Sequence, residues 1–227
     1  MANLHSPPGE EITGRRSLPP QNNYQVAFDS AAEELRNSDL IDRCAKSGAT
    51  LEKVGNGDFI IKLLYLNRIC EIRIPEMRIA YEGSEEDIPV WAKILILHYL
   101  NRSKGLVLSA SPITFRQVPG GSGYYPAYVK RALSPLVNAF GSDPKLLIEA
   151  AKQLGGWENP QGDASVTIPA FPHVPLTIIV WKGDEEFPAS ANILFDATIT
   201  ENLSTEDIEV LCQMVALKLS KWVTFRR

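Results

Sequence analysis

Apolar positions change their spacing several times along the chain, and each change predicts a different kind of element. Residues 1–20 hold four prolines and show no apolar periodicity, which predicts a disordered tail. A short helix with a modest apolar face is expected within residues 24–35. A second helix is expected over Asp39–Lys46, with Gly48 as the residue that ends it.

An antiparallel β-meander is expected next. The strand-like runs 50–54 and 59–64 flank residues 55–58, which contain an Asn-Gly pair. Such a pair between two strand-like runs strongly favours a β-hairpin. Residues 69–74 alternate apolar and polar side chains, as a half-buried strand does, and residues 77–81 could extend the meander.

The middle of the chain has helical spacing. Residues 88–101 are apolar on nearly every side, which predicts a central buried helix. Residues 105–109 are expected to form a strand or an extended segment. Apolar positions at i, i+3, i+4 and i+7 predict a helix over 125–140, in which Pro126 lies near the first position and Pro135 must kink or split the helix.

The C-terminal part mixes helices and strands. Asp143 and Pro144 are expected to begin a helix that two glycines end at 155–156. Strands are expected over 164–168, 176–181 and 192–199. Prolines 169, 172 and 175 argue against a central strand between the first two of these runs. A last helix with one apolar stripe is expected to start at Ser204.

These elements predict an α+β fold with a mostly antiparallel sheet, formed by the N-terminal meander and the C-terminal strands, and with packed helices. No linker composition interrupts the chain after the tail, so residues 21–227 are expected to form a single compact domain.

Charge and cysteine content limit the function classes. The formal net charge is −4 and no run of Lys or Arg stands out, which argues against nucleic acid and anionic membrane surfaces as partners. The three cysteines are far apart and form no C-x-x-C pair, so no metal site is expected from the thiols alone. Together with the lack of a signal-peptide pattern, this composition predicts a soluble, cytoplasmic protein.

The glycine-rich stretch that follows Val118 is the first candidate site. Glycines approach a ligand closely, and the stretch leads into a predicted helix whose N-terminus favours anions. It matches neither a phosphate-binding loop nor a nucleophile elbow. The candidate ligand-binding residues are Arg116, Gly120, Gly121, Ser122, Gly123, Tyr124 and Tyr125. The alternative is a glycine turn that only lets two elements pack closely.

An acidic turn is the second candidate site. Asp184, Glu185 and Glu186 follow an apolar strand, and Asp196 comes from the next predicted strand. These carboxylates could hold a hard cation or bind a basic partner, although a capped surface turn is the simpler interpretation. His98, inside the predicted central helix, is interpreted as a structural residue.

Several motifs together resemble an uncharacterised family of anaerobic bacteria and some archaea, known as domain of unknown function 3786. They are Leu97–Leu100, Pro119–Gly121 with Tyr124, Leu154–Gly156, Gly162–Asp163, Gly183–Pro188, Leu194–Asp196 and Glu206–Asp207. The resemblance implies an anaerobic setting linked to iron–sulfur or corrinoid metabolism. It implies no reaction.

Three hypotheses follow. The first is a binding or accessory module for an anionic small molecule or cofactor of unknown identity, with a redox or corrinoid protein as a potential partner. The second is an enzyme in which Tyr124 or Tyr125 and one carboxylate of the acidic turn act as acid and base. The third is an interaction subunit that docks through the acidic turn. The first two place the glycine stretch and the acidic turn around one shared hollow.

Overall fold

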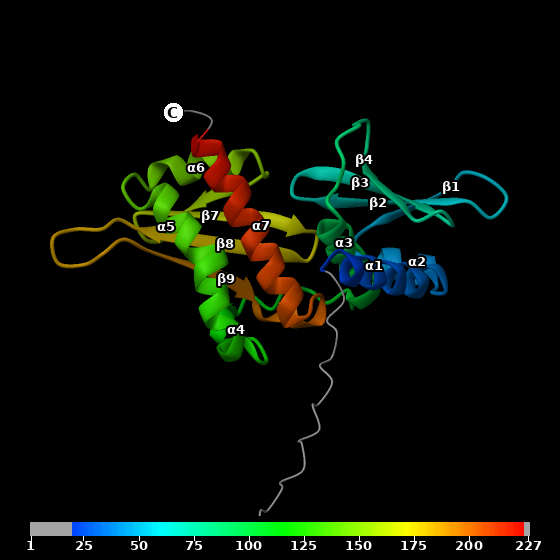
Figure 1. The fold of residues 1–227 in the computed structure, drawn as a ribbon, viewed down its shortest axis with the longest axis horizontal. Helices are drawn as coiled ribbons and strands as arrows, with labels where there is room; N and C mark the ends of the chain where they lie inside the picture. Colours follow the sequence, from blue (N-terminus) through cyan, green and yellow to red (C-terminus); the bar gives the residue numbers. More distant parts are fainter. Residues whose placement is uncertain (1–19, 225–227) are drawn as a thin grey trace, which may run out of the picture.

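The computed structural model describes residues 20–224, so the predicted disordered tail lies outside the described residues apart from Pro20. The described chain forms two halves that lie side by side, each built on an antiparallel sheet (Figure 1). The N-terminal half contains α1 (Pro20–Arg36), α2 (Leu40–Ser47), β1 (Thr50–Lys53), β2 (Phe59–Tyr65), β3 (Arg68–Ile74), β4 (Arg78–Tyr81) and α3 (Val90–Arg102). The C-terminal half contains β5 (Pro112–Thr114), the 3-10 helix η1 (Phe115–Gln117), α4 (Gly121–Tyr128), the π-helix η2 (Val129–Leu133), α5 (Ser134–Phe140), α6 (Lys145–Lys152), β6 (Trp157–Asn159), β7 (Ala164–Phe171), β8 (Val174–Trp181), β9 (Ser190–Asp196), the 3-10 helix η3 (Ala197–Glu201) and α7 (Thr205–Thr224).

The N-terminal sheet confirms the predicted meander. Its strands follow one another in the order β1-β2-β3-β4, and every neighbouring pair is antiparallel. The predicted hairpin turn joins β1 to β2, and Gly57 has the positive φ of 97° that such a turn requires. Alternating residues of β2 and β3, among them Leu63 and Ile72, are fully buried, so one face of this sheet packs into the core.

The central helix α3 is buried, as its sequence predicts. Eight of its thirteen residues are buried, which is why its apolar pattern extends almost all round. It packs against α1 and α2. α2 itself begins where the Asp39 carboxylate accepts the N–H groups of Ile41 and Asp42, and it ends at Gly48, whose φ is 70°.

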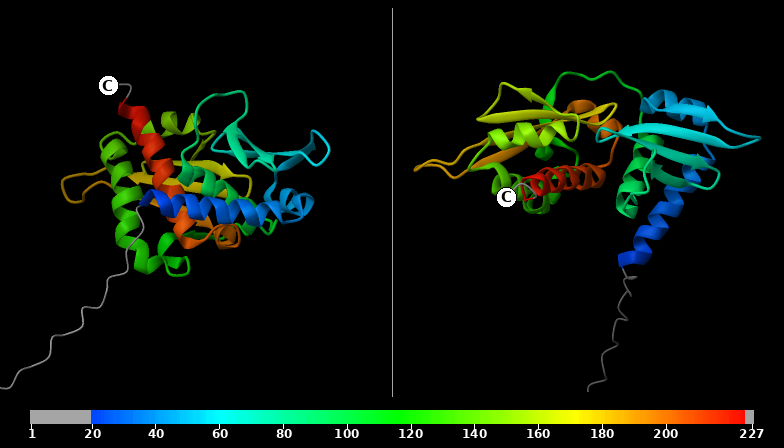
Figure 2. Two further views of the ribbon diagram at one scale, coloured as in Figure 1. Left: turned by 45° about the vertical axis from the view of Figure 1, so that its right-hand side comes forward. Right: turned by 90° about the horizontal axis from the view of Figure 1, so that it is seen from above.

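The C-terminal sheet has the order β5-β9-β8-β7-β6 and is antiparallel throughout. α5, α6 and α7 lie on one face of it, where Val166, Ile168, Leu176 and Ile178 are fully buried (Figure 2). Within the part of the chain that the structure describes, no α-helix covers the opposite face (Figure 2). The predicted α+β fold with mostly antiparallel strands and packed helices is therefore confirmed.

The prediction that prolines exclude central strands after residue 168 is wrong. β7 and β8 are central strands that continue through Pro169 and Pro175, which lie opposite each other. The pairing of β6 stops at Thr167 and that of β9 stops at Leu176, so the missing proline N–H groups face no neighbouring strand there. A register shift follows between Pro169 and Phe171.

The predicted helix over 125–140 is longer and more irregular than expected. It begins at Gly121, so Pro126 lies inside α4 rather than at the first position, and the glycine stretch itself forms the first turn. The π-helical segment η2 then separates α4 from α5, just before Pro135. The predicted disruption near Pro135 is therefore confirmed, and its form is one π-helical turn.

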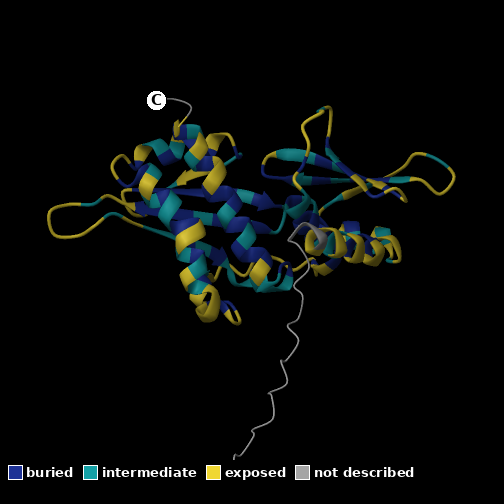
Figure 3. Ribbon diagram, in the orientation of Figure 1, coloured by how far each residue is buried: buried dark blue, intermediate teal, exposed yellow. Residues whose placement is uncertain are grey.

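An aromatic cluster joins the two halves. The ring of Phe171 lies 4.2 Å from that of Tyr99, nearly parallel to it, and 5.0 Å from that of Tyr65. The hydroxyl of Tyr99 donates to the carbonyl of Ser47 and accepts the N–H of His173. Both halves contain buried residues (Figure 3), and the buried apolar side chains of both belong to one continuous cluster. The single domain over 21–227 stays a prediction that this continuous core supports.

Residues 103–111 connect the two halves as an extended segment without regular structure, on the side of the C-terminal sheet that faces away from α7 (Figure 2). Its apolar side chains are exposed, and Val107 is 90% exposed. None of the helices among residues 20–224 is both long enough and apolar enough to cross a membrane.

Candidate functional site

The glycine stretch is the first turn of α4. Gly120 precedes the helix with a φ of 74°, and the residues from Gly121 onwards are helical. The N–H of Gly121 donates to the carbonyl of Val118 at 2.8 Å, and the N–H of Gly123 donates to the carbonyl of Gly120 at 3.0 Å. These two amides are therefore engaged within the turn, which weakens the anion-binding nest that the sequence suggests.

Packing and backbone conformation account for two of the glycines. A Cβ atom on Gly121 would lie 1.9 Å from the carbonyl oxygen of Phe115, so only glycine allows α4 to pack this closely against η1. Gly120 has a left-handed backbone conformation, which glycine adopts without the strain that a side chain would cause. Gly123, in contrast, has open space around it.

The structure brings Arg116 and Tyr125 together. The guanidinium carbon of Arg116 lies 3.8 Å above the centre of the Tyr125 ring, an arrangement that permits a cation–π interaction. Arg116, Ser122 and Tyr124 are exposed, whereas Tyr125 is partly buried against the core. These side chains share one surface at the start of α4.

The acidic turn is organised by one of its own carboxylates. Asp184 accepts the N–H groups of Phe187 at 2.7 Å and of Glu186 at 2.9 Å, and these hydrogen bonds hold the pKa of Asp184 below its usual 3.8. Glu185 and Glu186 are exposed on the loop between β8 and β9. The arrangement is a capped surface turn, the simpler of the two interpretations.

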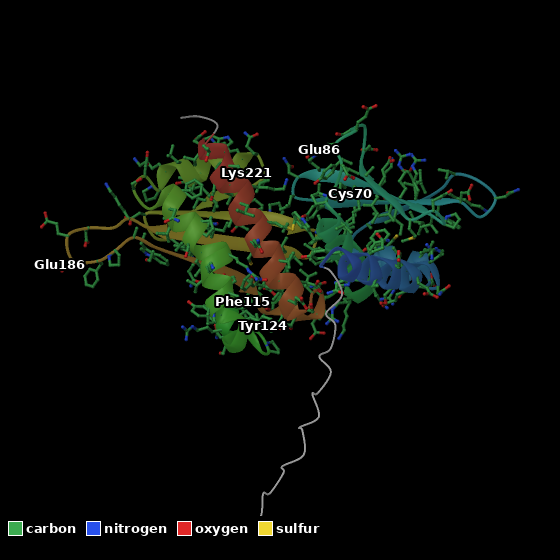
Figure 4. All side chains as sticks on the ribbon, in the orientation of Figure 1. Cys70, Glu86, Phe115, Tyr124, Glu186 and Lys221 are labelled. Atoms are coloured by element: carbon green, nitrogen blue, oxygen red, sulfur yellow. The ribbon has the colours of Figure 1, made fainter. Side chains whose placement is uncertain are left out.

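The glycine stretch and the acidic turn are not neighbours. Glu186 lies at the tip of the β8–β9 loop and Tyr124 lies at the start of α4, well separated in the view of Figure 4. The hairpin directs its loop away from the sheet, whereas α4 begins at the other end of the helical layer (Figure 1). The expectation of one shared hollow is therefore wrong, and so is acid–base pairing between the two stretches.

Asp196 lies apart from the rest of the acidic turn, at the far end of β9. Its carboxylate accepts the N–H and hydroxyl groups of both Thr198 and Ser109, at 2.7–3.1 Å. Burial acts to raise the pKa of Asp196, but these four hydrogen bonds outweigh burial and lower the pKa to about 2. Asp196 thus fastens the extended segment 103–111 to the sheet.

A cavity of about 500 Å³ lies on the open face of the C-terminal sheet, bordered by Asp196 and by Leu108 of the extended segment. Strand pairing places Trp157 opposite Thr167, Thr167 opposite Thr177 and Thr177 opposite Leu194, so these four residues form one row across the sheet. The volume lies within the range of roughly 300–1,000 Å³ that is common for small-molecule sites.

A short chain of hydrogen bonds forms the polar centre of this cavity. The side-chain amide of Asn159 donates to the hydroxyl of Thr167 at 2.8 Å, and the hydroxyls of Thr167 and Thr177 are 2.8 Å apart. When the hydroxyl of Thr167 donates to that of Thr177, the hydroxyl proton of Thr177 is left to donate to a ligand. The surrounding walls are largely apolar, with Leu108, Pro169, Phe171, Pro175 and Leu194 among them.

The cavity on the open face was missed from the sequence. The available signal was the alternation of Ser165 and Thr167 with apolar residues in β7, and the single Thr177 in the apolar run of β8. This alternation indicates that one face of the sheet is partly polar. It does not show that Asn159 lies beside both threonines, because β6 is too short to predict.

His98 and Asp207 form a hydrogen-bonded pair that the sequence analysis did not predict. Nδ1 of His98 lies 2.7 Å from Oδ1 of Asp207, and Oδ2 of Asp207 accepts the hydroxyl of Ser204 at 2.5 Å. The hydrogen bond to Asp207 raises the pKa of His98 above its usual 6.5. Burial acts to raise the pKa of Asp207, but the hydrogen bonds from His98 and Ser204 outweigh it, so the pKa lies below 3.8.

The three cysteines are buried, which favours their neutral thiol form. Burial raises the pKa of Cys44 to about 11 and that of Cys70 to about 12, and burial also raises the pKa of Cys212 well above its usual value. All three are unpaired. Within residues 20–224, no three His, Cys, Asp or Glu side chains converge in a group that could hold a metal ion.

The fold and the cavity define an α+β protein whose C-terminal sheet is covered by helices on one face and offers a ligand-sized, largely apolar cavity on the other. The chain belongs to the family described as "Domain of unknown function (DUF3786)", whose model matches residues 39–218. This span runs from the residue that caps α2 into α7. No curated protein and no solved structure matches the chain. The family resemblance is confirmed, whereas its restriction to anaerobic bacteria and archaea stays a prediction.

Proposed function

We propose that the protein is a binding module that holds a small molecule on the open face of its C-terminal sheet. The observation that carries this proposal is the cavity itself, with apolar walls around the Asn159–Thr167–Thr177 chain. Ligand sites commonly combine such walls with a few fixed polar groups, because burial of the apolar body supplies affinity and the polar groups fix orientation.

The lining indicates an uncharged ligand. Among the described residues, those that line the cavity include no Lys, Arg or His, and their one carboxylate, Asp196, already accepts four hydrogen bonds. An anion would lose its hydration there without gaining a counter-charge. A flat, largely apolar molecule with one or two hydrogen-bonding groups suits the cavity better.

The test is a compound screen that uses Trp157 as reporter. This side chain borders the cavity and is 52% exposed, so a bound ligand should change its fluorescence. Hits that raise the melting temperature should lose the fluorescence change in Trp157→Phe and lose binding in Leu194→Arg, which fills the cavity. Leu217→Arg, at an exposed leucine of α7, is the matched control. Hits that bind Leu194→Arg as tightly as the unmodified protein would disprove the proposal.

The anionic ligand expected from the sequence is a second candidate, at the start of α4. The exposed Arg116 above Tyr125 supports it, and the iron–sulfur or corrinoid setting is supported only by the family resemblance. Titration with phosphate and citrate, followed by thermal shift, should show stabilisation that Arg116→Ala removes and Arg78→Ala retains. Equal stabilisation of both variants would reject this site.

A protein partner at the acidic turn is a third candidate. Phe187 is 67% exposed beside the exposed Glu185 and Glu186, and such an apolar side chain among carboxylates suits a partner with a basic rim. Pull-down from a native host should weaken with salt and with Phe187→Ser. The three unpaired cysteines support the proposed cytoplasmic setting.

A further inference from the structure

A second cavity, of about 190 Å³, lies between α1, α3 and the start of α7. Tyr24 and Trp91 supply aromatic rings to its lining, Glu206 and Asp207 supply carboxylates, and His98 supplies an imidazole. At roughly 30 Å³ for each water molecule, the cavity has room for about six waters. A ligand of similar size has about five or six non-hydrogen atoms.

The charges around this cavity favour a cation. Asp207 and Glu206 come from α7, and Glu34 on α1 is close enough to raise the pKa of His98. Arg102 on α3 acts in the opposite direction on His98, and no Lys or Arg is among the residues that line the cavity. Arg43 of α2 lies 3.9 Å from Glu34, and Asp207 is paired with His98, so Glu206 is the lining carboxylate of the described chain that has no cationic partner.

The hydrogen bonds around Asp207 leave one ring nitrogen of His98 for a ligand. Both carboxylate oxygens of Asp207 are engaged, one by His98 and the other by Ser204. Asp207 is only 8% exposed, and it holds the Nδ1–H tautomer of the neutral ring. Nε2 is then the ring nitrogen of His98 that is left to accept a hydrogen bond from a ligand, and His98 is among the residues that line the cavity.

We propose that this cavity binds a primary ammonium group. Trp91 and Tyr24 line the cavity, and aromatic rings attract a cation placed over their faces. The carboxylate of the exposed Glu206 supplies the counter-charge, and Nε2 of neutral His98 accepts one N–H. The same chemistry suits a free alkylamine and the side chain of a lysine on a partner protein.

Binding is coupled to the proton of His98, because the ammonium group requires the neutral imidazole. Below the raised pKa of His98, each unit of pH should weaken binding about tenfold, and above it affinity should be constant. Alkylammonium groups have a pKa of about 10.4, so the ligand keeps its charge over this range. A bound ammonium should in turn lower the pKa of His98.

The test is an NMR titration of the full chain with n-butylammonium, at pH 5.5 and pH 8. We expect saturable shifts of the Trp91 indole and the His98 ring, with at least tenfold tighter binding at pH 8. n-Butanol, which lacks the charge, should not bind, and tetramethylammonium, which lacks an N–H, should bind with less dependence on pH. Tighter binding of Nα-acetyl-lysine amide, which keeps its side-chain ammonium group, than of n-butylammonium points to a partner lysine. Weaker binding points to a free amine.

Two substitutions complete the test. Glu206→Gln should weaken binding of n-butylammonium by about fivefold or more, whereas Glu185→Gln, the same charge change on the distant β8–β9 loop, should leave it unchanged. The proposal is overturned if the unmodified protein shows no saturable shift at either pH, if affinity is the same at both, or if the two variants behave alike. None of these outcomes affects the proposal for the open sheet face.

Discussion

Replacement of Gly121 by alanine tests whether this glycine is required for packing rather than for a ligand. An added Cβ atom would lie 1.9 Å from the carbonyl oxygen of Phe115, whereas real Cβ atoms essentially never come closer than 3.0 Å to such an atom. This oxygen belongs to the backbone of η1, so it cannot rotate away as the end of a side chain could. Either α4 or η1 must move by about 1 Å.

The expected cost comes from this forced displacement. Overpacking in a close-packed region costs about 1–3 kcal/mol, and a clash with backbone belongs at the upper end of that range. For a protein of this size, 1 kcal/mol changes the melting temperature by roughly 2–4 °C. We therefore expect the clash to lower the free energy of unfolding by about 2–3 kcal/mol and the melting temperature by roughly 4–12 °C.

Gly123→Ala is the matched control. Gly123 also lies in the first turn of α4, and a Cβ there would meet nothing within 4 Å. Both substitutions gain the same helix propensity of up to about 1 kcal/mol, so the difference between the two variants isolates the clash. We expect Gly123→Ala to be neutral or slightly stabilising.

The measurement is urea unfolding and thermal melting of both variants without added ligand. Equal stability of Gly121→Ala and Gly123→Ala would refute the packing argument and return Gly121 to the list of candidate ligand-binding residues. A loss of stability confined to Gly121→Ala would leave a ligand unnecessary to explain this glycine.

Three further predictions concern other parts of the molecule. Phe171→Ala should lower the free energy of unfolding by about 3–5 kcal/mol in urea titrations, because it empties the aromatic cluster between the halves, while Phe187→Ala should change little. The lowered pKa of Asp196 contributes stability that is present above pH 3.8 and lost as pH falls towards about 2. In Asp196→Asn, the free energy of unfolding should therefore depend less on pH in that window, and proteolysis of segment 103–111 should increase. The raised pKa of His98 contributes stability that is present below pH 6.5 and lost as pH rises through the raised pKa. Asp207→Asn should remove this loss of stability at high pH. Urea unfolding midpoints measured between pH 5 and pH 9 test this expectation.

The local pattern of apolar and polar residues is sufficient to predict most of the helices and strands. Alternating side chains and an Asn-Gly turn predicted the N-terminal meander, and an almost wholly apolar helical run predicted the buried α3. The apolar stripe of α7 was also visible, and Ile208, Leu211 and Leu219 are buried as it implies. These predictions succeed because the period of a helix or strand decides which side chains share a face.

Tertiary structure decided the roles of individual residues. Gly121 is explained by its approach to Phe115, and Pro169 is tolerated in a central strand because no neighbouring strand requires its N–H. The hypothesis of a hollow shared by the acidic turn and the glycine stretch rests on residue type alone. Their separation follows from the direction of the β8–β9 hairpin.

The two cavities also depend on contacts that only the tertiary structure reveals. The sequence contains Thr167, Thr177, His98 and Asp207, but it does not show which of them meet. The threonines meet through the register of β7 and β8, and His98 meets Asp207, 109 residues later, through the packing of α3 against α7. Sequence determines which faces are apolar, because periodicity is a property of neighbouring residues. Only packing determines which faces meet, because that depends on contacts between distant parts of the chain.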